Sequence, residues 1–442
     1  MEDFGTLSLL LSYSGFLIYL FTLGSFQYLF KRVNDGAEEK KSALWSSFML
    51  TAGISVISTC IAFVFAGPIC SALNLSNYED DFKLTIIGTA ITSIMIVFLF
   101  YHYGLGRNNF QNFLQFLRGS LWVIVAIAAS FLFQLSLTQI FIVFNISILF
   151  ILLTAVPWKE LPQLLQRPLN ISMQPLIKYC IPLLPYFAGV WGIPTIIRSQ
   201  LNISEGPKSV ALFSVAYTLM EIVFMFISTI TATLSPHFFA EEEDKDKPAL
   251  LYNVMLKYSI LLIVLIIPFV YITRFDVILL LTSNKYLEAG KYIPLLIIFP
   301  LLRVLIIVFE QVYLKESKTI FLGTVYSIGM ALSFVLSLIL VPKYSVLGAI
   351  YASLASYLFL FICLYIKQHH KIDFNYQRPL AILTLAIILW ASVFLLDIFN
   401  FHSFIKAIPL AGVAVLSVFL LPVFNEQEKH KLLVMLKIRN EG

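Results

Sequence analysis

Five ionisable side chains stand inside long apolar stretches of this 442-residue chain: Arg118, Glu221, Lys257, Arg303 and Glu310. A charge at the centre of a membrane helix costs about 2.5–3.5 kcal/mol on insertion scales, so each one needs an interior partner or a water-filled cavity. Arginine suits phosphate because its planar guanidinium can form two parallel hydrogen bonds. These residues therefore predict an anion site within the apolar part of the chain.

The composition indicates which class of protein carries these charges. Hydrophobic residues make up 59% of the chain and charged residues 12%, whereas a typical soluble domain has about 25% charged residues. This excludes a soluble enzyme and predicts an all-α polytopic membrane protein. A crossing needs about 20 mostly apolar residues, a length that favours helices over barrel strands. The predicted membrane helices cover residues 6–30, 43–66, 84–104, 112–133, 137–156, 177–197, 209–235, 250–272, 292–314, 319–341, 346–366, 380–397 and 404–423.

The basic residues of the connecting segments predict the orientation of these helices. The odd-numbered loops and the C-terminal tail carry 19 lysines and arginines, and the N-terminus and even-numbered loops carry 8. Cytoplasmic loops hold the excess of basic residues in membrane proteins. We therefore expect a cytoplasmic C-terminus and, with thirteen spans, an N-terminus on the outer side.

A weak internal repeat relates the two halves of the chain. The stretch from Phe4 to Ser8 corresponds to Val210–Ser214, and the turn at Ser76 corresponds to Ser283, at offsets of 206 and 207 residues. Helices 1–5 then match helices 7–11 in a parallel repeat, and helix 6 has no counterpart. We infer that a first helix is missing from the first bundle. The predicted parts are bundles at 1–170 and 171–371, two additional helices at 372–425, and a basic tail at 426–442.

The arginines have two interpretations on this topology. In the first, Arg118 and Arg303 bind an anionic head group near mid-membrane, with Arg32 on the cytoplasmic side of the cavity and Arg198 on the outer side. In the second, Arg32 and Lys257 only reach the cytoplasmic interface with their charged ends. We adopt the binding role for Arg118 and Arg303, and we retain Arg32 and Arg198 as candidates.

The two acidic residues within spans are also open to two interpretations. Glu310 follows Arg303 by seven residues and shares its helical face. Glu310 and Glu221 either bind a proton or Na⁺ during a transport cycle, or neutralise a neighbouring arginine. The first five spans contain no acidic residue, and the four cysteines form no CxxC motif. We expect no metal site, no cofactor and no disulfide.

Several short motifs are distributed along the chain: Thr22-Leu23-Gly24, Tyr28–Arg32, Pro182–Tyr186, Val210–Tyr217, Asn284–Ala289 and Leu340–Ala349. They resemble motifs of bacterial polysaccharide and O-antigen flippases, members of the multidrug/oligosaccharidyl-lipid/polysaccharide exporter superfamily. The resemblance covers nearly the whole chain and carries no catalytic signature. Two positions depart from it: Ile197 replaces the acidic member of an Asp-Arg pair, and Ser345 replaces a turn glycine.

The resemblance implies a flippase of the bacterial inner membrane that works by alternating access. Its substrate would be an undecaprenyl-pyrophosphate-linked oligosaccharide, an O-antigen or capsule repeat unit, and its partners membrane lipids and a polysaccharide polymerase; nucleic acid is not expected. A cation-coupled multidrug antiporter of the same superfamily is the alternative, although it would carry acidic residues inside the first bundle. A membrane glycosyltransferase is a weaker alternative, because residues 273–291 offer only Asp276 and Glu288.

Overall fold

The chain folds entirely into helices over the part that the structure describes. The computed structural model describes residues 1–33, 37–159, 173–239, 247–316, 318–368, 379–398 and 403–421, and these contain no strand. Within them, ten helices are long and apolar enough to cross a membrane, and the apolar helices Ala381–Leu396 and Ile405–Val418 are shorter. The all-α polytopic fold is therefore confirmed. The basic tail predicted at 426–442 lies outside the described residues.

Contacts between residues divide the chain into two compact units. Unit 1 comprises Met1–Ala211 and Ser317–Ser356, and unit 2 comprises Leu212–Glu316 and Tyr357–Gly442. Unit 1 thus contains helices from both halves of the predicted repeat. The division of the chain at residues 171, 372 and 426 rests on the repeat and not on contacts, and it stays a prediction.

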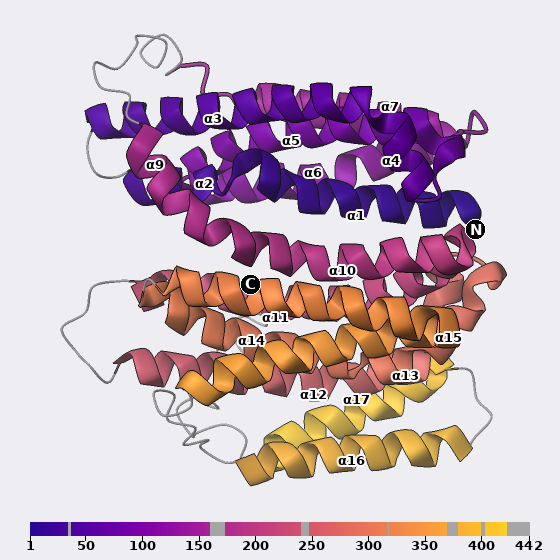
Figure 1. Ribbon diagram of the computed structural model, residues 1–442. Helices are drawn as coiled ribbons and strands as arrows, with labels where there is room; N and C mark the ends of the chain where they lie inside the picture. The colour runs from indigo at the N-terminus through magenta and orange to yellow at the C-terminus, as the bar shows by residue number, and fades with distance from the viewer. Residues whose placement is uncertain are drawn as a thin grey trace. The chain divides into compact units, whose positions relative to one another are not determined.

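Unit 1 contains the helices of the first half of the chain together with the start of α15 (Figure 1). Its elements are α1 (Glu2–Thr22), α2 (Ser25–Arg32), α3 (Ala37–Val64), α4 (Ala66–Ala72), η1 (Ser76–Tyr78), α5 (Glu79–Gly104), α6 (Asn108–Ser130), α7 (Leu137–Ala155), α9 (Met173–Cys180), η2 (Ile181–Leu183) and α10 (Leu184–Glu205).

Unit 2 contains most of the second half. Its elements are α11 (Pro207–Phe239), α12 (Lys247–Leu281), η3 (Asn284–Lys291), α13 (Ile293–Leu296), α14 (Ile298–Lys315), the end of α15 (Thr319–Gln368), α16 (Pro379–Ile398) and α17 (Ser403–Leu420). The helices α12, α16 and α17 share an apolar core around Leu385, Leu389 and Leu410. Each of the thirteen predicted ranges contains a helix, and α15 covers two of them.

The first predicted span is broken into α1 and α2 at Leu23 and Gly24. Both residues have positive φ angles, 48° and 75°, a conformation that glycine adopts without strain. The Thr22 hydroxyl accepts a hydrogen bond from the Gly24 amide at 3.4 Å and donates one to the Ile18 carbonyl at 2.9 Å. The Thr-Leu-Gly motif therefore ends one helix and starts the next.

Prolines break the sixth predicted span into α9, η2 and α10. Pro182 lies in the single turn η2 and Pro185 is the second residue of α10, where a missing amide hydrogen costs no helical bond. Pro194 lies inside α10 and removes one hydrogen bond from it. Figure 1 shows α9 turning away from the direction of α10 at this break.

Helix α5 lies at the centre of unit 1. It contacts α1, α2, α3, α6 and α7, and an apolar core forms around its residues Met95, Val97 and Leu99. In the apolar 18-residue stretch that marks each helix as a candidate span, 67% of the residues are buried in α5 and only 6% in α6. The polar residues of α5 are therefore held inside protein, while one side of α6 is exposed.

Helix α15 is kinked at Ser345, whose φ of 51° and ψ of −127° are not helical. A side chain in this conformation is strained by about 1–3 kcal/mol. A Cβ added to Gly348 would collide with the Leu340 carbonyl across the kink. Ser345 thus occupies a conformation that glycine tolerates, at the position where the resemblance expects a glycine.

Replacing Ser345 by glycine should raise the free energy of unfolding by about 1 kcal/mol, because glycine adopts positive φ without the steric cost. The measurement is thermal unfolding of the purified protein in detergent. The matched control is Ser327→Gly within the regular part of α15, which should lower stability by about 0.5–1 kcal/mol. A loss of stability in S345G would show that the kink is not strained.

Candidate functional site

A face of small polar residues on α5 lies against α1. Thr85, Thr89 and Ser93 recur every fourth residue and are buried, and each hydroxyl donates to the carbonyl four residues earlier at 2.7–2.8 Å. Ser14 of α1 is an alternative acceptor for the Thr89 hydroxyl hydrogen, with its Oγ 2.9 Å from that of Thr89. Because these three hydroxyls use the backbone as acceptor, they add polar groups to the interface and are themselves satisfied.

A cavity of about 200 Å³ opens beside this interface. It is smaller than the roughly 300–1,000 Å³ of most small-molecule sites, so it suits part of a larger ligand. Its lining comes from five helices of unit 1: Leu11, Ser14, Gly15, Ile18 and Tyr19 from α1, Thr92 and Ile96 from α5, Arg118 from α6, Phe144 and Ile148 from α7, and Trp191 from α10.

Arg118 is the one charged residue in the lining of this cavity. It lies in the middle of α6 and is half-buried. Its guanidinium interacts electrostatically with Tyr19, and it forms no hydrogen bond or ion pair with any residue that the structure describes. When Ser14 accepts the Thr89 hydrogen, the Ser14 hydrogen can be donated into the cavity beside Arg118.

Aromatic rings form one wall beside Arg118. Tyr19 stacks on Phe187 at 5.1 Å and on Trp191 at 6.0 Å between ring centroids, and its hydroxyl is hydrogen-bonded to Trp191. Phe26 extends the cluster at 5.6 Å from Phe187. These rings are held by one another, so the cavity wall is preformed.

Helix α10 approaches α1 closely at this wall, and Figure 1 shows the two running side by side. Gly15 permits the approach, because a Cβ there would lie 2.9 Å from the Trp191 ring. Towards the other end of α10, the Thr195 hydroxyl donates to the Ser12 carbonyl at 3.1 Å, and Ser199 lies 2.9 Å from the Tyr13 hydroxyl. The α1–α10 interface thus combines a glycine contact with hydroxyl hydrogen bonds.

The other predicted arginines of unit 1 lie outside the lining of this cavity. Arg198 is 9% exposed on α10 and donates to the Pro194 carbonyl of its own helix at 3.4 Å. Arg32 ends α2 and lies 3.8 Å from Glu39, with 43% of its side chain exposed. Their assignment to substrate binding stays a prediction.

Unit 2 holds the remaining predicted residues. Arg303 of α14 is half-buried, with its guanidinium carbon 4.8 Å from the ring of Phe224 and 5.4 Å from that of Tyr357. Glu310, on the same helix, is 4% exposed. Glu221 is half-buried on α11 and forms no ion pair with a described residue. Their roles in binding or coupling also stay predictions.

One buried acidic residue escaped the sequence analysis. Asp81 is 5% exposed near the start of α5, which begins at Glu79, five residues before the predicted span. The predicted span at 84–104 begins after Asp81, so the expectation that the first five spans contain no acidic residue did not cover this position. The run Glu79-Asp80-Asp81 is typical of a solvent-exposed helix start. Only the four-residue spacing from Asp81 to Thr85 and Thr89 indicates that Asp81 lies on the inward face of the helix.

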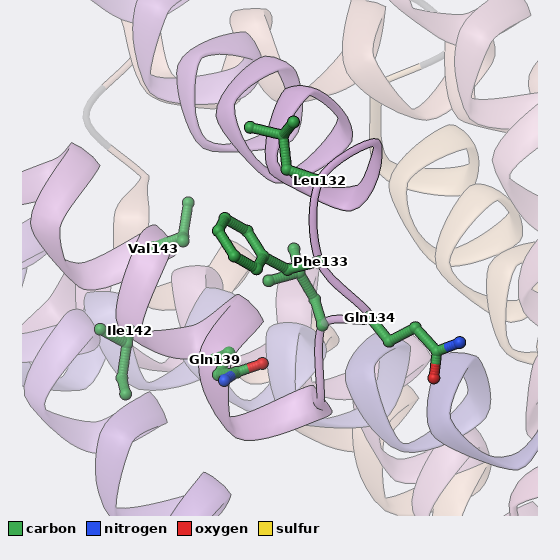
Figure 2. Close-up of a pocket in the computed structure, with 7 residues that line it drawn as sticks. Leu132, Phe133, Gln134, Gln139, Ile142 and Val143 are labelled. Atoms are coloured by element: carbon green, nitrogen blue, oxygen red, sulfur yellow. The ribbon is translucent and has the colours of Figure 1, made fainter.

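A second hollow, at the turn between α6 and α7, is wide and open. Its volume is about 600 Å³, and Figure 2 shows the Phe133 ring in its middle, between Leu132 and Gln139. The lining consists of apolar residues and two glutamines and carries no charge. The hollow lacks the groups that would fix a ligand in one orientation, so the Arg118 cavity is the better candidate site.

Comparison with known proteins identifies the fold. No family model and no curated protein sequence matches the chain. Among solved structures, the lipid II flippase MurJ in an inward closed conformation aligns with a TM-score of 0.72 and 14% identity, over 95% of this chain and 91% of MurJ. An inward-facing multidrug resistance MATE family transporter of the MOP superfamily aligns with a TM-score of 0.63 and 12% identity, over 87% of this chain and 95% of its own.

A third structure is a MOP superfamily transporter from Pyrococcus furiosus Vc1 with a binding pocket of reverse polarity. It aligns with a TM-score of 0.57 and 13% identity, over 84% of this chain and 86% of its own. These similarities show that the chain has the fold of MurJ and MATE transporters. Together with its apolar helices, the fold makes it a multi-pass membrane protein.

Replacing Arg118 by methionine should raise the free energy of unfolding by about 1–3 kcal/mol, because the substitution removes an unpaired charge from a membrane helix. Thermal unfolding in detergent measures this. Arg32→Met is the control, since the exposed Arg32–Glu39 pair is worth under about 1 kcal/mol. A clear loss of stability in R118M would show that Arg118 has a structural role.

Proposed function

We propose that this protein is a flippase for anionic, lipid-linked molecules, and that its substrate is an undecaprenyl-pyrophosphate-linked oligosaccharide. The observation that carries the proposal is Arg118, a half-buried cation in a cavity of unit 1 without a protein counter-ion among the described residues. A charged side chain inside a membrane protein is costly, and a bound ligand of opposite charge offsets that cost. MurJ, which shares the fold, is a lipid II flippase.

The cavity suits the phosphate end of such a substrate. The guanidinium of Arg118 donates to phosphate oxygens in a fork, and the Ser14 hydroxyl is a second donor. About 200 Å³ accommodates a phosphate group but not an entire oligosaccharide. The sugars would extend beyond the cavity, and the polyprenyl tail would stay in the lipid.

The remaining parts of the proposal rest on the predicted topology and on the family resemblance. The protein belongs in the bacterial inner membrane with a cytoplasmic C-terminus, and it transfers the head group from the cytoplasmic to the outer leaflet by alternating access. Arg303 is the corresponding cation of unit 2, with Arg32 and Arg198 nearer the two surfaces. Glu221 and Glu310 are candidates for coupling, and a polysaccharide polymerase is the partner that would consume the product.

A flipping assay in proteoliposomes tests the role of Arg118. A fluorescent undecaprenyl-pyrophosphate oligosaccharide is reconstituted with the protein, and its accessibility to a membrane-impermeant quencher reports transfer between leaflets. Arg118→Ala should slow transfer about tenfold to a hundredfold, because a hydrogen bond to a charged group is worth about 1.5–3 kcal/mol. Arg303→Ala should slow it to a similar degree.

The control for this assay is Arg107→Ala. Arg107 precedes α6 and lies outside the cavity, so transfer should proceed at the wild-type rate. Equal rates for wild type, R118A and R303A would contradict the cavity assignment. A neutral lipid-linked sugar that flips as fast as the pyrophosphate form would contradict the anionic substrate.

A cation-coupled multidrug antiporter is the second candidate. Two observations favour it: a MATE family transporter shares the fold, and Asp81 is a buried acidic residue in the first half of the chain. Deleting the gene decides between the two functions. Loss of surface polysaccharide supports the flippase, and greater sensitivity to cationic drugs with unchanged polysaccharide supports the antiporter.

A further inference from the structure

Of the residues that line the Arg118 cavity, Trp191 is the one that remains exposed. Its exposed fraction is 41%, and it lies near the middle of the candidate span Met173–Glu205. Tryptophans of membrane helices gather at the two water interfaces, where the amphipathic ring is at the level of the lipid head groups. Trp191 lies away from both interfaces, so this preference does not account for it.

The indole of Trp191 is held in place by α1. A Cβ at Gly15 would lie 2.9 Å from the indole ring, and the Tyr19 ring stacks on the indole with 6.0 Å between centroids. Gly15 and Tyr19 are four residues apart and therefore share one face of α1. The indole N–H also donates a hydrogen bond to the Tyr19 hydroxyl. The ring is thus covered on its α1 side, and the remainder of it is open.

Two hydroxyl groups of the same lining have hydrogen-bonding capacity that the described residues leave unused. An indole N–H can only donate, so Tyr19 accepts that bond, and its own hydrogen has no acceptor within the described part of the chain. The Thr92 hydroxyl donates to the Gly88 carbonyl at 2.7 Å, which leaves its oxygen able to accept. The open indole ring therefore shares its cavity with one available donor and one available acceptor.

A sugar ring has the complementary surface. One face of a pyranose carries polarised C–H groups, which the negative face of an aromatic ring attracts, and its rim carries hydroxyls that both donate and accept. An apolar ligand, such as a polyprenyl or acyl chain, would use neither the Tyr19 hydrogen nor the Thr92 oxygen. The open ring and the two hydroxyls together fit a carbohydrate better than a lipid chain.

We propose that Trp191, with Tyr19 and Thr92, binds the sugar that is joined directly to the pyrophosphate of the cargo. This subsite rests on the proposed function, because it requires the phosphate to bind Arg118. Arg118 and Trp191 line one cavity of about 200 Å³, so a single phosphosugar can reach both. The two hydroxyls fix the orientation of the sugar and the indole binds its apolar face. The following sugars extend past the exposed part of the ring.

The subsite makes the cavity selective for a lipid that carries its sugar. The Arg118 guanidinium binds phosphate oxygens whether or not a sugar is attached, so charge alone does not distinguish the cargo from bare undecaprenyl pyrophosphate. Contact with an aromatic face adds a preference of about threefold to tenfold. The protein therefore transfers sugar-bearing lipid in preference to the bare carrier.

Binding of two probes to the purified full-length protein in detergent tests the subsite. One probe is undecaprenyl pyrophosphate, and the other carries a single N-acetylhexosamine on the pyrophosphate; titration calorimetry gives both dissociation constants. Wild type should bind the sugar-bearing probe about threefold to tenfold tighter. Trp191→Leu removes the aromatic ring, so it should bind both probes with the affinity that wild type has for the bare one. Trp191→Phe keeps a ring and should keep most of the preference.

Two further variants separate ring stacking from a general effect on the fold. Gly15→Ala keeps every atom of the indole but pushes it away from α1, because the added Cβ would lie 2.9 Å from the ring, and it should lower the preference. Trp158→Leu is the matched control. Trp158 is also exposed and its indole N–H also donates, to the Leu153 carbonyl at 2.7 Å, but it lies outside the cavity. W158L should keep the wild-type preference.

The outcomes distinguish the failure of this subsite from the failure of the proposed function. The subsite is overturned, and the flippase proposal stands, if wild type binds both probes equally well or if W191L and G15A keep the wild-type preference. It is also overturned if W191L weakens both probes to the same extent, or if W158L loses the preference as well. A wild-type protein that binds neither probe refutes the proposed function and the subsite with it. Weaker binding of both probes by R118A, at an unchanged preference for the sugar, supports both.

Discussion

The absence of water from the core of a bilayer is the constraint on which this structure depends. Backbone groups there find hydrogen bonds only within helices, and side-chain polar groups find them only inside the protein. Unit 1 satisfies this condition by placing many of its buried polar residues on α5, the helix with the most protein around it. Thr85, Thr89 and Ser93 donate to backbone carbonyls, and few polar atoms are left over. Arg118, which has no counter-ion among the described residues, is where a ligand is proposed to bind.

Much of the fold was predictable from apolar length and helix-breaking residues. Each predicted span contains a helix, because about 20 apolar residues without a barrel-like alternation allow little else. Pro182 and Pro185 explain the break before α10, since a missing amide hydrogen acts locally. The kink at Ser345 was harder to predict from the sequence. A serine at positive φ is uncommon, and only the comparison with a family glycine marked the position.

The candidate site was predictable only in part. Arg118 was identified because a charge in an apolar helix is conspicuous. The aromatic residues that line its cavity, Tyr19 and Trp191, come from α1 and α10, which are remote in sequence from α6. Asp81 was missed because it directly follows two other acidic residues at the start of a helix. Composition cannot separate three neighbouring carboxylates that differ only in the direction they face on a helix. That difference needs the packing of α1 and α7 around α5.

The shallow burial of α6 has a mechanical consequence. This helix carries Arg118, yet only 6% of its apolar window is enclosed by protein, and Phe116, Ile124 and Ile127 are exposed on it. In a membrane these side chains contact acyl chains, so bilayer thickness and lateral pressure act directly on the position of α6. Helix α5 is shielded from the same forces by its neighbours. The geometry of the arginine cavity is therefore sensitive to the lipids around it, while the polar interface behind it is not.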